Sequence, residues 1–72
     1  GRTAMGTRAR VGEIAVDPKV IPLGSRVYIE GVGARIAEDT GGNIKGNTID
    51  IYMNSASECR KWGVRTVTIY IE

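Results

Sequence analysis

Five short runs rich in valine, isoleucine and threonine follow one another along the chain, and glycine or proline residues separate several of them. Three of the runs alternate apolar with polar side chains, which is typical of strands that bury one face. The sequence therefore predicts a mainly β fold built from short strands, at residues 13–16, 26–30, 34–39, 48–53 and 66–71.

The chain has 72 residues, so it forms one domain at most and supplies only a modest hydrophobic core. Cys59 is the single cysteine, which excludes a disulfide within the chain. A small open sheet exposes its edges, whereas closure into a barrel removes them. We therefore expect residues 1–72 to form a single small β-barrel domain.

Residues 55–62, SASECRKW, carry the one clear helix pattern. Ser55 and Glu58 have the spacing of a capping box. Gly63 follows at the position where glycine often ends a helix. This segment predicts one short helix beside the strands.

Charge and composition exclude several functions. The net charge is only +2 and the basic residues do not cluster, so no nucleic-acid partner is predicted. The sequence contains no stretch apolar enough for membrane insertion. Histidine is absent, which removes the usual general base and the commonest zinc ligand. Any acid–base chemistry must come from Asp, Glu, Lys or Tyr, and neither a cofactor nor a metal is predicted.

The stretch EDTGGNIKG, residues 38–46, admits three interpretations. Asp-Thr-Gly is the aspartic-protease signature, which would require a homodimer whose two aspartates share a proton, but Glu38 precedes it where such enzymes have an apolar residue. A phosphate-binding loop would need Lys and Ser or Thr after Gly46, where Asn47 and Thr48 stand. The third interpretation makes Asp39 an acid for another kind of substrate.

Two further aspartates occupy comparable places. Asp17 ends a strand before Pro18, 22 positions ahead of Asp39, and Asp50 lies 11 positions after it in a predicted strand. Each one alone fits a turn or a solvated position, and together they predict a carboxylate site at one rim of the barrel. Two nearby carboxylates can raise one pKa enough to keep a protonated acid near neutral pH. Three carboxylates could also bind Ca²⁺ or Mg²⁺, but the spacing of a metal-binding loop is missing.

A longer match connects these features. The elements AVDP, VIPLGSRVYIEG, AEDTGG, IKGN and IDIY follow one another in order. They resemble the three-aspartate (3D) domain family, which is related to the catalytic barrel of membrane-bound lytic transglycosylase A and to stationary-phase muralytic proteins. The three aspartates that name the family fall on Asp17, Asp39 and Asp50. The resemblance implies a double-psi β-barrel.

It also implies an activity. A lytic transglycosylase cleaves the bond between N-acetylmuramic acid and N-acetylglucosamine in peptidoglycan and forms a 1,6-anhydro product without water. One carboxyl serves as acid and then as base, which suits a chain without histidine. We expect Asp39 to fill this role, with Asp50 and Asp17 tuning its pKa and contacting the sugar. The residues expected to bind substrate are Thr40, Gly41, Gly42 and Lys45; the lysine could instead keep Asp39 ionised.

The alternative from another class is a module that binds peptidoglycan without cutting it. Both interpretations imply a bacterial protein that is secreted or attached to the cell wall. The family domain usually begins with a further strand, whereas this chain starts at Gly1-Arg2-Thr3-Ala4. A missing strand would expose a sheet edge, so we expect a homodimer formed by strand exchange or edge pairing.

Overall fold

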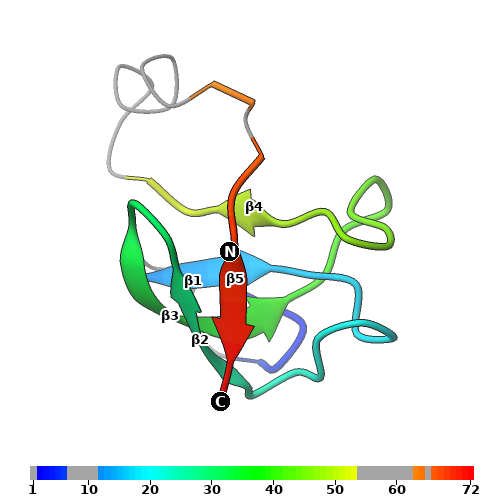
Figure 1. Ribbon diagram of the computed structural model, residues 1–72. Helices are drawn as coiled ribbons and strands as arrows, with labels where there is room; N and C mark the ends of the chain where they lie inside the picture. The colour runs from blue at the N-terminus through cyan, green and yellow to red at the C-terminus, as the bar shows by residue number, and fades with distance from the viewer. Residues whose placement is uncertain (1, 7–11, 54–62, 65) are drawn as a thin grey trace.

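The computed structural model describes residues 2–6, 12–53, 63, 64 and 66–72. These residues form five strands and no helix, which confirms the prediction of a mainly β fold (Figure 1). None of them belongs to a helix that could span a membrane. The helix predicted at 55–62 lies outside the described residues. The strands are β1 (Glu13–Ala15), β2 (Arg26–Ile29), β3 (Gly33–Asp39), β4 (Asp50–Ile51) and β5 (Ile69–Ile71).

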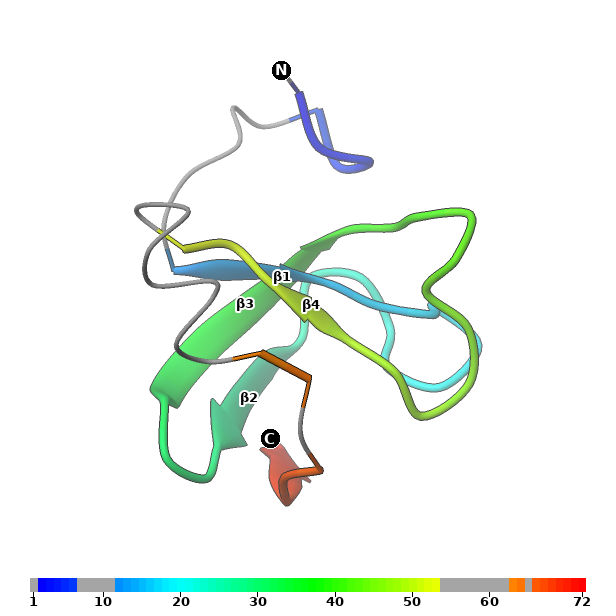
Figure 2. The same cartoon turned by 90° about the horizontal axis from the view of Figure 1, so that it is seen from above.

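All five strands belong to one mixed sheet in the order β4-β1-β3-β2-β5. β1 runs parallel to β3, and the other three pairings are antiparallel. Figure 2 shows β4 on one side of this arrangement and the C-terminal strand on the other, beyond β2. Within the described residues no pairing joins β4 to β5, so barrel closure stays a prediction. That residues 1–72 form a single domain also stays a prediction.

A tight hairpin turn at residues 31–33 joins β2 to β3, which pair antiparallel. Gly31 and Gly33 have φ values of 84° and 112°, a left-handed conformation that favours glycine. The Val32 N–H donates to the Ile29 carbonyl oxygen over 2.9 Å. The register of β2 with β3 is regular up to this turn, and the irregularity of the sheet lies instead between Ile14 and Ala15 of β1.

The alternation of apolar residues sets the two faces of the sheet. In β2, Val27 and Ile29 are fully buried, while Tyr28 and Arg26 are exposed, in agreement with the predicted period of two. The buried apolar side chains form one core cluster, Ile14, Val16, Ile21, Val27, Ile29 and Ala37. We call the opposite side of the sheet, on which Tyr28 lies, the outer face.

β4 is shorter than the predicted strand at 48–53 because its partner is short. It pairs only with Ile14 and Ala15 of β1. After Val16 the chain leaves the sheet in a turn, where the N–H groups of Val20 and Ile21 both donate to the Asp17 carbonyl oxygen. Residues 48 and 49 therefore have no stretch of β1 beside them.

Candidate active site

Two of the three predicted aspartates lie in one row across the sheet. Ala15 in β1 is the register partner of Asp39 in β3 and also of Asp50 in β4. Neighbouring strands are about 4.8 Å apart, so the two aspartate Cα atoms are separated by roughly 10 Å. Ala15, which has a small side chain, stands between them.

An irregularity in the register puts Asp39 into this row. Ile14 lies opposite Ala37, but the next residue, Ala15, lies opposite Asp39 rather than Glu38. Side chains alternate between the faces of a strand, so a shift by one residue exchanges those faces. The bulge therefore turns Asp39 to the outer face that Ala15 and Asp50 share, away from Ile14 and Ala37 in the core.

The Asp39 carboxylate is held at one of its two oxygens. Oδ1 accepts hydrogen bonds from the Thr40 N–H at 2.8 Å and from the Ala4 N–H at 2.9 Å. Within the part of the chain that the structure describes, Oδ2 accepts none. The side chain is half-buried. Asp39 thus has a defined orientation, and its Oδ2 atom is not engaged by the described residues.

Asp17 is used differently, because both of its oxygens are engaged. Oδ1 accepts the Lys19 N–H at 3.0 Å, and Oδ2 accepts the Gly46 N–H at 2.8 Å. These two bonds lower the pKa of Asp17 below its ordinary value of 3.8, and the bond from Gly46 has the larger effect. The positive charges of Lys45 and Lys19 lower the pKa further, whereas burial raises it. Asp17 therefore fastens the loop at 40–47 to the turn that follows β1.

This role predicts how Asp17→Asn changes stability with pH. Asparagine keeps one acceptor oxygen, so one backbone N–H loses its partner and the melting temperature should fall at neutral pH. The ionised carboxylate stabilises the fold at pH values above 3.8, and this contribution is lost as the pH falls through the lowered pKa of the folded state. The gap between variant and wild type should therefore close in acid, which thermal unfolding at several pH values would measure. A constant gap would contradict the assignment, and Glu30→Gln, at an exposed turn, should melt like the wild type at neutral pH.

The predicted substrate-binding residues all lie in the loop at 40–47. The Thr40 N–H is used within the chain, on Asp39. Gly41 closes a tight turn, since its carbonyl oxygen accepts the Ile44 N–H and a Cβ at Gly41 would lie 3.0 Å from the Ile44 Cγ1 atom. Gly42 is exposed with open space around it, and its backbone is accessible to a ligand. Lys45 is exposed, and its charge acts on the pKa of Asp17.

Tyr52 is an exposed aromatic residue close to Asp50 in the sequence. It lies two positions after Asp50, and its N–H donates to the Glu13 carbonyl oxygen over 3.1 Å, which keeps it beside β1. Its side chain is 47% exposed. In a strand, residues two positions apart lie on the same face, so the sequence of residues 48–53 by itself predicts that Asp50 and Tyr52 share one. What the sequence could not show is that this face stays open.

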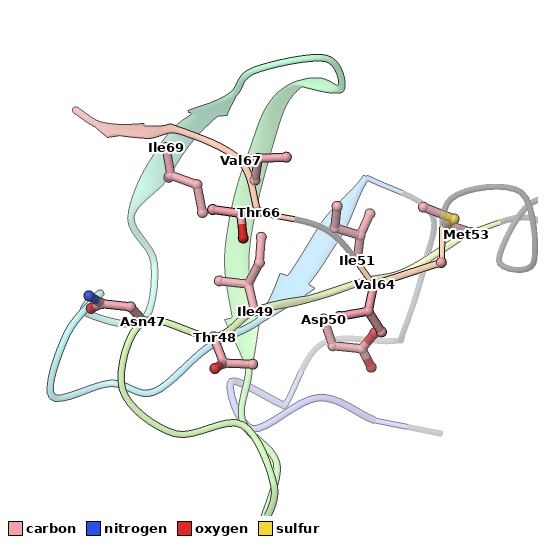
Figure 3. A pocket seen from close by; sticks show the side chains of 11 residues that line it. Asn47, Thr48, Ile49, Asp50, Ile51, Met53, Val64, Thr66, Val67 and Ile69 are labelled. Carbon is pink, nitrogen blue, oxygen red and sulfur yellow. The ribbon is translucent and has the colours of Figure 1, made fainter.

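A hollow of about 430 Å³ lies beside β4 (Figure 3). Its lining includes the apolar side chains of Ile49, Ile51, Val67 and Ile69. Asp50 also lines this hollow, so one member of the aspartate row lies at its edge. Among the described residues no group of three His, Cys, Asp or Glu side chains is placed to hold a metal ion.

Comparison with known proteins identifies the family. The sequence matches the 3D domain over residues 12–71. The chain belongs to the 3D domain family. The match covers β1 to β5, including Asp17, Asp39 and Asp50.

Three relatives of this 3D domain come from Bacillus subtilis (strain 168). The "Cell wall-binding protein YocH" is 59% identical over 58 residues, which are 81% of this chain and 20% of the relative. The "Putative cell wall shaping protein YabE" is 49% identical over 75 residues, 99% of this chain and 18% of the relative. The "SPbeta prophage-derived uncharacterized protein YorM" is 48% identical over 59 residues, 78% of this chain and 25% of the relative. The chain thus spans a quarter or less of the length of each.

Proposed function

We propose that this 3D domain is a peptidoglycan lytic transglycosylase that acts at the bacterial cell wall. The observation that supports it most is the state of Asp39, which shares a row with Asp50 and has one oxygen held by two backbone N–H groups, while its other oxygen accepts no bond from the described residues. A single oriented carboxyl is what the reaction needs. The names of two relatives, which refer to cell wall binding and cell wall shaping, agree with this location.

In the proposed reaction Asp39 acts twice. Its protonated carboxyl donates the proton from Oδ2 to the glycosidic oxygen as the bond to the muramyl C1 breaks, and N-acetylglucosamine leaves with a 4-hydroxyl group. The C6 oxygen of the same muramyl residue then bonds to C1, and its proton returns to Oδ2. The carboxyl is regenerated and no water is consumed. The two-carboxylate arrangement that hydrolytic glycosidases use is therefore unnecessary.

The other aspartates support this step. Asp50, across Ala15, provides a negative charge that favours the positive charge developing at C1. Asp17 positions the loop at 40–47, in which Gly42 offers its backbone to the glycan. In this proposal the sheet closes between β4 and β5 as a double-psi β-barrel, and residues 1–72 act as one domain.

Tyr52 gives a testable detail of substrate binding. Its half-exposed ring beside Asp50 can stack on the face of a sugar. We expect Tyr52→Ala to raise KM for a soluble muro-oligosaccharide about three- to tenfold with little change in kcat, because one aromatic contact is lost and the proton transfer is not. Tyr52→Phe should behave like the wild type. Tyr70→Ala, which removes another exposed tyrosine ring, on β5, is the control, and a KM that rises equally in both variants would contradict the placement.

The second candidate function is a module that binds glycan without cutting it, which the name of the first relative favours. Incubation of the chain with purified sacculi, followed by mass spectrometry of the soluble fraction, distinguishes the two. Release of 1,6-anhydromuropeptides supports the enzyme. Sedimentation of the protein with the sacculi, with no anhydro products, would instead establish a binding module and overturn the proposed activity.

A further inference from the structure

A pair of tyrosines lies on the outer face at the other end of the sheet. Tyr28 in β2 and Tyr70 in β5 are direct register partners, and their ring centroids are 6.5 Å apart with the ring planes tilted by 47°. The two rings are 53% and 57% exposed. Figure 1 shows β2 and β5 together at the C-terminal end of the chain, where this pair lies. Neither ring takes part in the carboxylate row.

The surroundings leave this pair accessible. On β3 the partner of Tyr28 is Ala34, whose methyl group cannot cover the ring. On the next row along the strands, Arg26 and Glu72 form an exposed ion pair at 3.9 Å. Cross-strand tyrosines stabilise a sheet by packing. Because about half of each of these two side chains is exposed, that half remains accessible to a ligand.

The size and chemistry of the patch select the class of ligand. Half of two tyrosine side chains amounts to roughly 200 Å², about a quarter of the 800 Å² that each partner contributes to a stable protein interface. A sugar ring needs less, since one pyranose face stacks on one aromatic ring. The phenol hydroxyls and the flanking charged pair can hydrogen-bond the sugar hydroxyls at the same time.

The distance to Asp39 determines which part of a glycan reaches the patch. Ala34 lies five positions from Asp39 along β3, and this separation corresponds to roughly 15 Å. Both lie on the side of the sheet that faces away from the core. A short oligosaccharide at Asp39 would not reach the tyrosines, whereas a polymeric strand that crosses this face would.

We propose that Tyr28 and Tyr70 form a second, non-catalytic binding site for the glycan strand of peptidoglycan. This inference rests on the proposed function for the identity of the ligand, but not on cleavage. The site would retain the polymer near Asp39 and would have no effect on substrates of a few sugar residues.

The binding experiment uses the full chain carrying Asp39→Asn, so that sacculi are not digested during the measurement. In this background, Tyr28→Ala with Tyr70→Ala should weaken co-sedimentation with purified sacculi about tenfold, as two aromatic contacts are lost. Tyr28→Phe with Tyr70→Phe keeps both rings and should retain most of the binding. Equal binding by the alanine and parent chains, or no binding by the parent chain, would overturn the proposal.

Activity separates this site from the proposed function. With Asp39 intact, the double alanine variant should cleave a soluble tetrasaccharide at the wild-type rate while releasing fewer products from sacculi. Equal loss on both substrates would overturn a separate site. Light scattering tests the other possible occupant of the patch, a second copy of this chain. If the wild type is a dimer and the double alanine variant is a monomer, the patch is a contact between copies, and glycan binding at this site is overturned.

A measurement on the unaltered rings covers the case in which the double alanine variant does not fold. Tyr28, Tyr52 and Tyr70 are all half-exposed and open to nitration by tetranitromethane. In the Asp39→Asn chain, which should not cleave the glycan, soluble polymeric glycan should protect all three from nitration, and a tetrasaccharide should protect Tyr52 alone. Polymer that leaves Tyr28 and Tyr70 as reactive as in the free protein would overturn the proposal.

Discussion

Asp39→Asn should reduce the release of anhydromuropeptides from sacculi by at least about a hundredfold, the usual contribution of general acid–base catalysis. An amide can neither donate the proton that the leaving oxygen requires nor accept the proton of the C6 hydroxyl. The reaction has no water-activating base to take over, and the chain contains no histidine. Mass spectrometry of the soluble products measures the effect directly.

Asp39→Asn tests catalysis separately from folding, because it preserves the hydrogen bonds around the side chain. Asparagine retains an oxygen at the Oδ1 position, which can still accept the N–H groups of Ala4 and Thr40. The melting temperature should therefore stay close to that of the wild type. Glu30→Gln removes an exposed carboxylate from a turn and should retain full activity. Full activity in Asp39→Asn would rule out the assignment and transfer the role to Asp50.

Ile14→Ala should cause a large loss of stability, about 3 kcal/mol, because it leaves a cavity in a buried core. Ile14 is 1% exposed and lies in β1. β1 pairs with β3, which contains Asp39, and with β4, which contains Asp50, so it positions both aspartates. A domain of this length has only about 3–5 kcal/mol of net stability from its core, so most of it would be lost. The melting temperature should fall by roughly 12–24 °C.

A graded series tests whether the loss comes from the cavity. Ile14→Val removes one methyl group and should cost about 1 kcal/mol. Val64→Ala removes two methyl groups from a fully exposed side chain and should change stability by less than about 0.5 kcal/mol. Chemical unfolding followed by circular dichroism gives all three values. Equal losses for Ile14→Val and Ile14→Ala would show that packing around Ile14 differs from the described core.

Much of the strand pattern could be predicted from the sequence, because it depends on residues that are close together along the chain. The positions of β2 and β3, the hairpin at Gly31 and Gly33, and the burial of Val27 and Ile29 all follow from alternation and from the φ values that glycine permits. The lengths of β4 and β5 did not follow, since a strand ends where its partner ends. That limit is set by contacts between distant segments.

The candidate site divides in the same way. The chain alone pointed to Asp17 and Asp39 by their places at strand ends, to Asp50 by its place in a predicted strand, and to all three by the resemblance to the 3D family. It could not tell their tasks apart. The hydrogen bond from the Gly46 N–H to Asp17 joins residues 29 positions apart, and that from the Ala4 N–H to Asp39 joins residues 35 positions apart.

The sequence by itself determined that this protein has β strands with two faces, glycine turns, and aspartates as acid groups in a chain without histidine. Only the tertiary structure decided which way these aspartates face and what they bind. A one-residue shift opposite Ala15 turned Asp39 to the side of Asp50, while two backbone N–H groups engaged both oxygens of Asp17. The physical reason is that side-chain direction and hydrogen-bond partners depend on register between strands, and register is set by packing across the whole sheet.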